Sequence, residues 1–182
     1  RCRCRFYRCN ACLTVCCCPL LPHRYITISG GFENVAAKSR ATIGGGMNNN
    51  NAGYASTIGG GAFNSALNEY STIGGGIRNS GTFSCSVVSG GLDNTAAGYG
   101  ATIGGGSTNI VNEAYSIIAG GQGNSVAGMH STVGGGSLNN ITLAYGFIGG
   151  GQEHFVASPH SVIGGGLRNT VGGTSSSFIG GG

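Results

Sequence analysis

A glycine run that returns every fifteen residues limits most strongly what this chain can fold into. The run follows an aliphatic residue at Ile28, Ile43, Ile58, Ile73, Val88, Ile103, Ile118, Val133, Ile148, Ile163 and Ile179. The interval is fifteen residues at every step except the last, which is sixteen. Self-similarity at a fixed period is the signature of a repeat architecture, in which each period forms one structural unit.

An asparagine keeps the same interval. It occupies Asn34, Asn49, Asn64, Asn79, Asn94, Asn109, Asn124, Asn139 and Asn169, with His154 as the one substitute. Glycine is costly inside an ordinary strand or helix because it loses the most conformational freedom on folding. Its recurrence beside regular aliphatic and asparagine positions therefore indicates bends at fixed places in each unit.

Composition excludes collagen, disorder and a membrane span as the reason for so much glycine. Glycine makes up 39 of the 182 residues but does not fall at every third place, and the chain has only 3 prolines, which excludes collagen. Only 8% of the residues are charged, and a regular aliphatic column with so few charges is not typical of disorder. No apolar stretch reaches the roughly 18 residues that cross a bilayer. We therefore expect an ordered, soluble repeat without membrane insertion.

One unit, residues 64–78, shows how the chain is expected to bend. Ser71, Thr72 and Ile73 alternate with the period of a strand, which puts serine and isoleucine on the inner face and threonine outside. A second inner position lies two residues after the asparagine and is small or branched at Ala36, Ala66, Ala96, Val111, Val126, Ile141, Val156 and Val171. The inward residues Ala66 and Ser71 are an odd number of residues apart, so one uninterrupted strand would place them on opposite faces. A corner is therefore expected between the two strands. Glycines four residues after the asparagine, as at Gly53 and Gly98, are expected at that corner, and the glycine run at the other.

These features predict an all-β chain, a β-solenoid (β-roll or β-helix) of about ten 15-residue coils over residues 26–182, with the repeat x-T-I-G-G-G-x-x-N-x-A. Equivalent positions would stack about 4.8 Å apart and give a rod roughly 50 Å long. The inward asparagines are expected to form a ladder in which each side-chain amide bonds the amides above and below. Opposite charges then meet between neighbouring coils, Arg78 with Asp93 and Glu153 with Arg168.

The pattern Ile-Gly, followed later by Gly-x-x-Ser-x-Ile as at Gly53, Ser56 and Ile58, resembles the head repeat of trimeric autotransporter adhesins. Similar glycine-rich repeats occur in surface fibres of bacteria, phages and large viruses. The resemblance covers about residues 26–182, although the usual coil of that family is one residue shorter. It implies a parallel homotrimer on a cell or virion surface.

A thin core also favours oligomerisation, because each coil buries only one large aliphatic side chain and one small one. The expected subunit contact is the outward column that contains Thr42, Thr57, Thr72, Thr102 and Thr132. The same column holds Val87, Ile117, Phe147 and Val162, so it becomes more apolar toward the C-terminal half.

No catalytic, cofactor-binding or metal-binding set stands out in the repeats. No Gly-Lys-Ser/Thr follows a glycine run, and no helix pattern follows one either, which excludes the common nucleotide fingerprints. His130 and His160 share a column with Tyr70, Tyr115 and Tyr145. That column is either a receptor or glycan contact or a row of exposed corner aromatics.

Residues 1–25 are a different, Cys/Arg-rich segment. Its cysteines are Cys2, Cys4, Cys9, Cys12, Cys16, Cys17 and Cys18. Disulfide cross-links are the preferred interpretation, and a zinc site, acylation or anchoring, and an error in the inferred sequence stay open beside it. The formal net charge of +4 comes from arginines in this segment, so no nucleic-acid groove is expected along the rod. Cys85 is expected to remain a free thiol.

The sequence therefore predicts a non-enzymatic structural or adhesive rod of an extracellular, cell-surface or virion-surface fibre, with multivalent attachment to a host surface or glycan. Its expected partner is itself, as a homotrimer or by end-to-end stacking. One alternative is an ice-binding solenoid that uses the threonine column. Another is a subunit of an end-to-end stacked extracellular filament, because no capping element follows the final coil.

Overall fold

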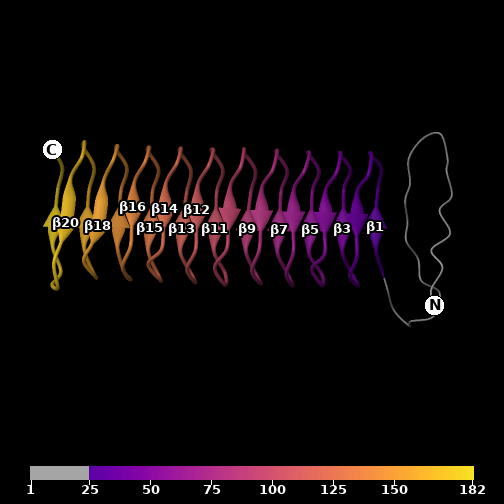
Figure 1. Cartoon of the computed structure of the whole chain (residues 1–182), viewed down its shortest axis with the longest axis horizontal. Helices are drawn as coiled ribbons and strands as arrows, with labels where there is room; N and C mark the ends of the chain where they lie inside the picture. The colour runs from indigo at the N-terminus through magenta and orange to yellow at the C-terminus, as the bar shows by residue number, and fades with distance from the viewer. Residues whose placement is uncertain (1–24) are drawn as a thin grey trace.

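The computed structural model describes residues 25–182, which form a straight stack of short parallel strands (Figure 1). The predicted cysteine cross-links lie outside the described residues. One strand of each coil belongs to a sheet of 11 strands: β1 (Thr27–Ile28), β3 (Thr42–Ile43), β5 (Thr57–Ile58), β7 (Thr72–Ile73), β9 (Val87–Val88), β11 (Thr102–Ile103), β13 (Ile117–Ile118), β15 (Thr132–Val133), β17 (Phe147–Ile148), β19 (Val162–Ile163) and β21 (Phe178–Ile179).

The other strand of each coil belongs to a sheet of 10 strands: β2 (Val35–Ala36), β4 (Asn50–Asn51), β6 (Ser65–Ala66), β8 (Ser80–Gly81), β10 (Thr95–Ala96), β12 (Ile110–Val111), β14 (Ser125–Val126), β16 (Asn140–Ile141), β18 (Phe155–Ala157) and β20 (Thr170–Gly172). We call these the first and second sheets, and we call each coil a rung. Neighbouring strands pair in parallel with a shift of fifteen residues, as in Ile103 with Val88 and Ile118, except that β19 and β21 pair with a shift of sixteen. The predicted β-solenoid of about ten turns is confirmed, and no helix occurs between residues 25 and 182.

A third line of contacts, which the sequence did not predict, closes each rung. Isolated parallel bridges join the residues just after the glycine runs, from Phe32 with Met47 to Gln152 with Leu167. Backbone hydrogen bonds on all three lines join one rung to the next, for example Thr57 N–H to the Ser71 carbonyl at 2.9 Å. These bonds run along the long axis of the rod in Figure 1.

The core is a set of stacked columns with the predicted strand parity. Ser71 and Ile73 are fully buried and Thr72 between them is exposed, while Asn64 just before the second strand and Ala66 within it are buried. The isoleucine and valine column is fully buried from Ile43 to Ile163. Stacked identical positions therefore replace the single globular core of an ordinary domain.

The rung at residues 141–146 shows how core volumes compensate. Ile141 is larger than the alanines and valines at equivalent positions, and Gly146 stands where most rungs have serine. A Cβ added to Gly146 would lie 2.5 Å from Ile141 Cγ2. The preceding rung holds Val126 with Ser131 instead. The larger side chain of Ile141 therefore fills the space that a serine side chain would occupy at position 146.

We expect Gly146→Ser to lower the free energy of unfolding by about 1 to 3 kcal/mol, the usual cost of overpacking a full core. Adding Ile141→Val should recover most of that loss, because the double variant reproduces the Val126 and Ser131 combination of the neighbouring rung. Urea unfolding followed by circular dichroism measures both. Additive effects of the two substitutions would contradict this packing account.

The bends differ from the sequence-based expectation. Glycine was expected at the corners. Two corner columns instead hold mostly non-glycine residues in the left-handed region, with φ between 51° and 63°. One column directly precedes the asparagine and includes Asn48, Phe63 and Arg78, and the other includes Tyr70 and His130. The left-handed region costs such residues roughly 1–2 kcal/mol each. Their N–H groups nevertheless donate to the preceding rung, as Tyr70 N–H does to the Tyr54 carbonyl at 2.9 Å, so the stack holds them in this conformation.

Glycine is required at the end of each glycine run, as predicted. Gly46 has a φ of 91°, and a Cβ there would lie 2.0 Å from the Gly61 carbonyl oxygen of the next rung. The glycines expected at the other corner are also confined, since a Cβ on Gly98 would lie 2.1 Å from the Glu113 carbonyl oxygen. Lys38 and Phe83 occupy the same column as Gly98, however, so that corner does not demand glycine in every rung.

Candidate functional site

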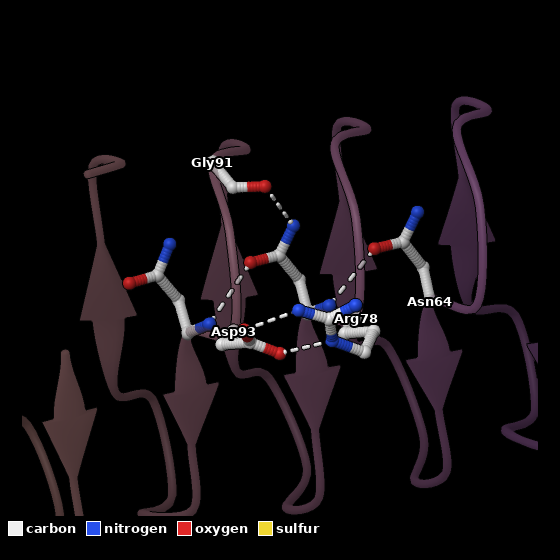
Figure 2. A network of polar contacts seen from close by, with 6 residues as sticks. Asn64, Arg78, Gly91 and Asp93 are labelled. Atoms are coloured by element: carbon white, nitrogen blue, oxygen red, sulfur yellow. Dashed lines mark hydrogen bonds and ion pairs between the residues drawn. The ribbon is translucent and has the colours of Figure 1, made fainter. Parts of the chain in front are cut away.

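The asparagine ladder lies inside the rod and ties each rung to both of its neighbours. The Asn79 backbone N–H donates to Asn64 Oδ1 at 3.0 Å, and Asn79 Nδ2 donates to the Gly91 carbonyl at 2.9 Å (Figure 2). Asn79 Nδ2 also donates to the Gly75 carbonyl at 3.0 Å. The predicted ladder is thus present, but most of its bonds join amides to the backbone. Direct amide-to-amide bonds occur between Asn49 and Asn34 and between Asn124 and Asn109. The asparagines therefore fasten the glycine bends, which explains why both recur together.

His154 replaces asparagine in this ladder and is 1% exposed. Its backbone N–H donates to Asn139 Oδ1 at 3.0 Å, and its Nδ1 accepts the Asn169 backbone N–H at 3.1 Å. The ring thus imitates the asparagine oxygen. Its Nε2, by contrast, has no hydrogen-bond partner, whereas the asparagine Nδ2 atoms donate to glycine carbonyls.

The outer side of the first sheet is the candidate contact surface between subunits. Its outward column runs through Thr42, Thr57, Thr72, Val87, Thr102, Ile117, Thr132, Phe147 and Val162. We call this column, with the glycine runs beside it, the threonine face. No Asp, Glu, Lys or Arg of residues 27–182 lies on it. Ile117 and Phe147 are 41% and 42% exposed there.

The middle glycines of the threonine face are not explained by packing within the chain. A Cβ added to Gly75 or Gly120 would meet no atom within 4 Å, and neither residue has a positive φ. The next residue, Gly76, differs in both respects, with a φ of 88° and a carbonyl oxygen 2.2 Å from an added Cβ. The fold therefore requires the last glycine of the run but not the middle one at these rungs.

Charged residues lie on the two corners that flank the second sheet. Arg78 Nε and Nη2 donate to Asp93 at 2.6 Å and 2.7 Å, and Arg168 Nε donates to Glu153 at 2.6 Å. Hydrogen bonds from these arginines lower the pKa of the Asp93 carboxyl and of the Glu153 carboxyl. Both predicted pairs are confirmed. Since the groups face solvent, the pairs indicate rung register more than stability.

Aromatic rings stack along the corner that leads from the second sheet back to the first. Tyr115, His130, Tyr145 and His160 form a continuous column with centroid separations of 5.2, 5.4 and 4.7 Å and interplanar angles of 9° or less. Four of the five residues of the predicted column therefore form one stack. Tyr70 is separated from it by Cys85 and Gly100 and packs edge-on against Tyr54 instead. The ring faces of the stack cover one another, so a glycan or receptor would meet ring edges and polar tips rather than open ring faces.

Tyr99 packs edge-on against Tyr115 at the N-terminal end of this stack, with the centroids 5.5 Å apart. A hydrogen bond with the Cys85 thiol raises the pKa of the Tyr99 hydroxyl. Cys85 is the single cysteine of residues 25–182, so the predicted free thiol stays a prediction. Cys85 and Tyr99 thus extend the corner without forming a recognisable reactive set.

Within the described part of the chain, no three His, Cys, Asp or Glu side chains gather as a metal site would require. The same residues include no helix long and apolar enough to cross a membrane. The candidate functional features described above are the threonine face, the charged corners and the aromatic stack.

Comparison with known proteins does not assign the chain to a family. No protein-family model matches the chain, and no curated protein matches it either. The structure consequently assigns a fold, a β-solenoid of about ten turns with fifteen-residue repeats, and no family.

Proposed function

We propose that this chain is a non-enzymatic rod of an extracellular or virion-surface fibre and that it associates with further copies, as a homotrimer, through the threonine face. The observation that carries the proposal is the absence of charge along that entire face, beside middle glycines such as Gly75 and Gly120 that the fold does not require. Depletion of charged residues is typical of the buried centre of a protein interface. Glycine there allows a partner backbone to approach closely.

A second copy suits this face because it has the same repeat. Eleven strands at about 4.8 Å make a strip about 50 Å long, and three residues of extended chain make it about 10 Å wide. With this face toward the trimer axis, each copy would bury about 500 Å², so the three copies together would bury about 1,500 Å², or about 500 Å² per pair. A copy in the same orientation keeps rung opposite rung over the whole length. Three copies would close the arrangement.

Association through this face leaves the second sheet and its corners outward. Each rung then displays its own polar, charged or aromatic side chains at fixed spacing along a stiff support. Weak contacts to a host surface or glycan would add together by avidity, so that no single strong binding site is needed. The proposal therefore accounts for a rod whose inner columns are uniform and whose outer residues vary from rung to rung.

Sedimentation equilibrium of the full chain tests the association. The expected result is a trimer of about 54 kDa, three times the chain mass of 18.0 kDa. Thr102→Arg with Phe147→Arg places charge on the threonine face and should give monomers that keep their β circular dichroism. Ser65→Arg, on the outer side of the second sheet, is the matched control and should leave the trimer intact. Wild-type monomers at high concentration would contradict the proposal.

Electron microscopy by negative stain separates the trimer from the filament alternative. Short rods of uniform length support discrete trimers, whereas long continuous fibres support end-to-end stacking. Either form is compatible with a structural rod, and particles without rod shape are not.

Ice binding is the second candidate, favoured by one observation. Thr27, Thr42, Thr57 and Thr72 lie in register on adjacent parallel strands. Each of these rungs offers one threonine rather than a pair, and Val87 ends the run. Thermal hysteresis in dilute solution tests it: a clear hysteresis gap that Thr57→Lys abolishes would favour ice binding over the fibre.

A further inference from the structure

His154 is the one position between residues 34 and 169 where the asparagine ladder is interrupted. We propose that this histidine makes the contact between its rung and the rung of Asn169 sensitive to acid, so that the C-terminal rungs open as the pH falls. The proposal concerns the solenoid itself and does not depend on the proposed fibre function.

The hydrogen bonds of His154 require one protonation state of the ring. Nδ1 accepts the Asn169 N–H, so it carries no proton, and the proton of the neutral ring lies on Nε2. A second proton would have to bind Nδ1. Two N–H donors would then face each other across 3.1 Å, and the hydrogen bond to the next rung would be lost.

The ring has no room to relieve this conflict by turning. It is 1% exposed, and an added Cβ on Gly151 would lie 2.4 Å from Nε2, so the ring already fills its space. A charged imidazolium would also be buried without a counter-ion, which is strongly unfavourable. Opening the rungs releases both constraints, because the ring then reaches water.

The groups around His154 do not compensate a positive charge. Its ladder partners, Asn139 and Asn169, are uncharged, and Gly151 contributes only backbone. The nearest carboxylate in sequence, Glu153, already pairs with Arg168 on the outer surface. That pairing lowers the pKa of the Glu153 carboxyl, so this pair stays ionised at pH 5 and the change between pH 7.5 and pH 5 does not come from it.

The same end of the rod is also less regular. The step from Ile163 to Ile179 contains one extra residue, and residues 172–178 are all exposed. The fold needs a neutral ring at His154, so a proton taken up on Nδ1 weakens the contact between these rungs and acid favours the open form.

Hydrogen exchange of the full chain at pH 7.5 and pH 5.0 tests the proposal, with rates corrected for the intrinsic effect of pH. Peptides from residues 155–171 should lose at least about tenfold in protection at pH 5.0, since a linked proton changes an equilibrium up to tenfold per pH unit. Peptides from residues 100–130 should not change. Unchanged protection of residues 155–171 in the wild type would overturn the proposal.

Two variants assign the effect to His154. His154→Asn restores the ladder residue and should keep residues 155–171 protected at both pH values. His160→Asn removes an exposed histidine of the aromatic stack from the same region and should leave the wild-type pH response in place. Loss of the response in His160→Asn, or its persistence in His154→Asn, would show that another group is responsible.

Discussion

Replacing Ile103 with aspartate is expected to unfold its own rung and both neighbours, with a loss on the order of 5 kcal/mol. Ile103 is fully buried and pairs in register with Val88 and Ile118. Its column contains only aliphatic side chains, so a carboxylate there has no partner and no access to water. Chemical unfolding followed by circular dichroism, or a loss of soluble yield, measures the effect.

Thr95→Asp is the matched control for this substitution. Thr95 lies on the outer side of the second sheet, next to buried Ala96. A carboxylate at that position remains in contact with water, so we expect a change below about 1 kcal/mol. A melting temperature that is unchanged in Ile103→Asp would mean that the strand faces are assigned the wrong way round.

Gly76→Ser should be comparably severe for a different reason. The new Cβ would lie 2.2 Å from the Gly91 carbonyl oxygen and 2.6 Å from Asn79 Nδ2, at a φ of 88°. It would therefore push the next rung away and break the ladder bond that Asn79 makes to Gly91. We expect a loss above about 4 kcal/mol, the range reached when a buried network and a special backbone conformation fail together.

Gly75→Ser, one residue earlier, separates folding from association. An added Cβ at Gly75 meets nothing within 4 Å, so the melting behaviour of the isolated chain should barely change. The same side chain would project from the threonine face and should weaken the proposed trimer. If Gly75→Ser left association unchanged, the middle glycines would have no role in subunit contact, and the threonine face would lose its main support as the interface.

The regular columns explain why so much of the fold was predictable. In a stack with a constant period, one correct assignment, such as Ile73 inward and Thr72 outward, applies to every rung. The charge pair of Arg78 with Asp93 follows from the same arithmetic. Register, parallel pairing and buried columns therefore needed only the interval and the alternation of residue types.

The third line of bridges and the left-handed corners were not predictable in this way. Residues such as Phe63 and Arg78 disfavour a positive φ on their own, and nothing in their chemistry marks a bend. Their conformation is imposed by hydrogen bonds to the preceding rung. Tertiary structure here overrides local preference, which a single sequence does not reveal.

The polar details of the candidate site needed coordinates as well. The sequence identified His154 as the substitute for asparagine, but not that Nδ1 would accept the bond normally taken by Oδ1. Likewise, the sequence showed that His130 and Tyr145 share a column, whereas the parallel stacking of their rings depends on the spacing of the rungs. The sequence thus located these residues in their columns, whereas the donor and acceptor of each hydrogen bond and the orientation of each ring followed only from the structure.

The direction of the backbone hydrogen bonds has a mechanical consequence. Because these bonds run along the long axis from rung to rung, a force pulling on the two ends loads the rungs in series. The weakest contact yields first, and the remaining rungs stay folded. Each released rung would replace about 5 Å of rod with about 50 Å of extended chain. Such a rod would lengthen stepwise under tension and dissipate energy at every step, which limits the peak force between its two ends.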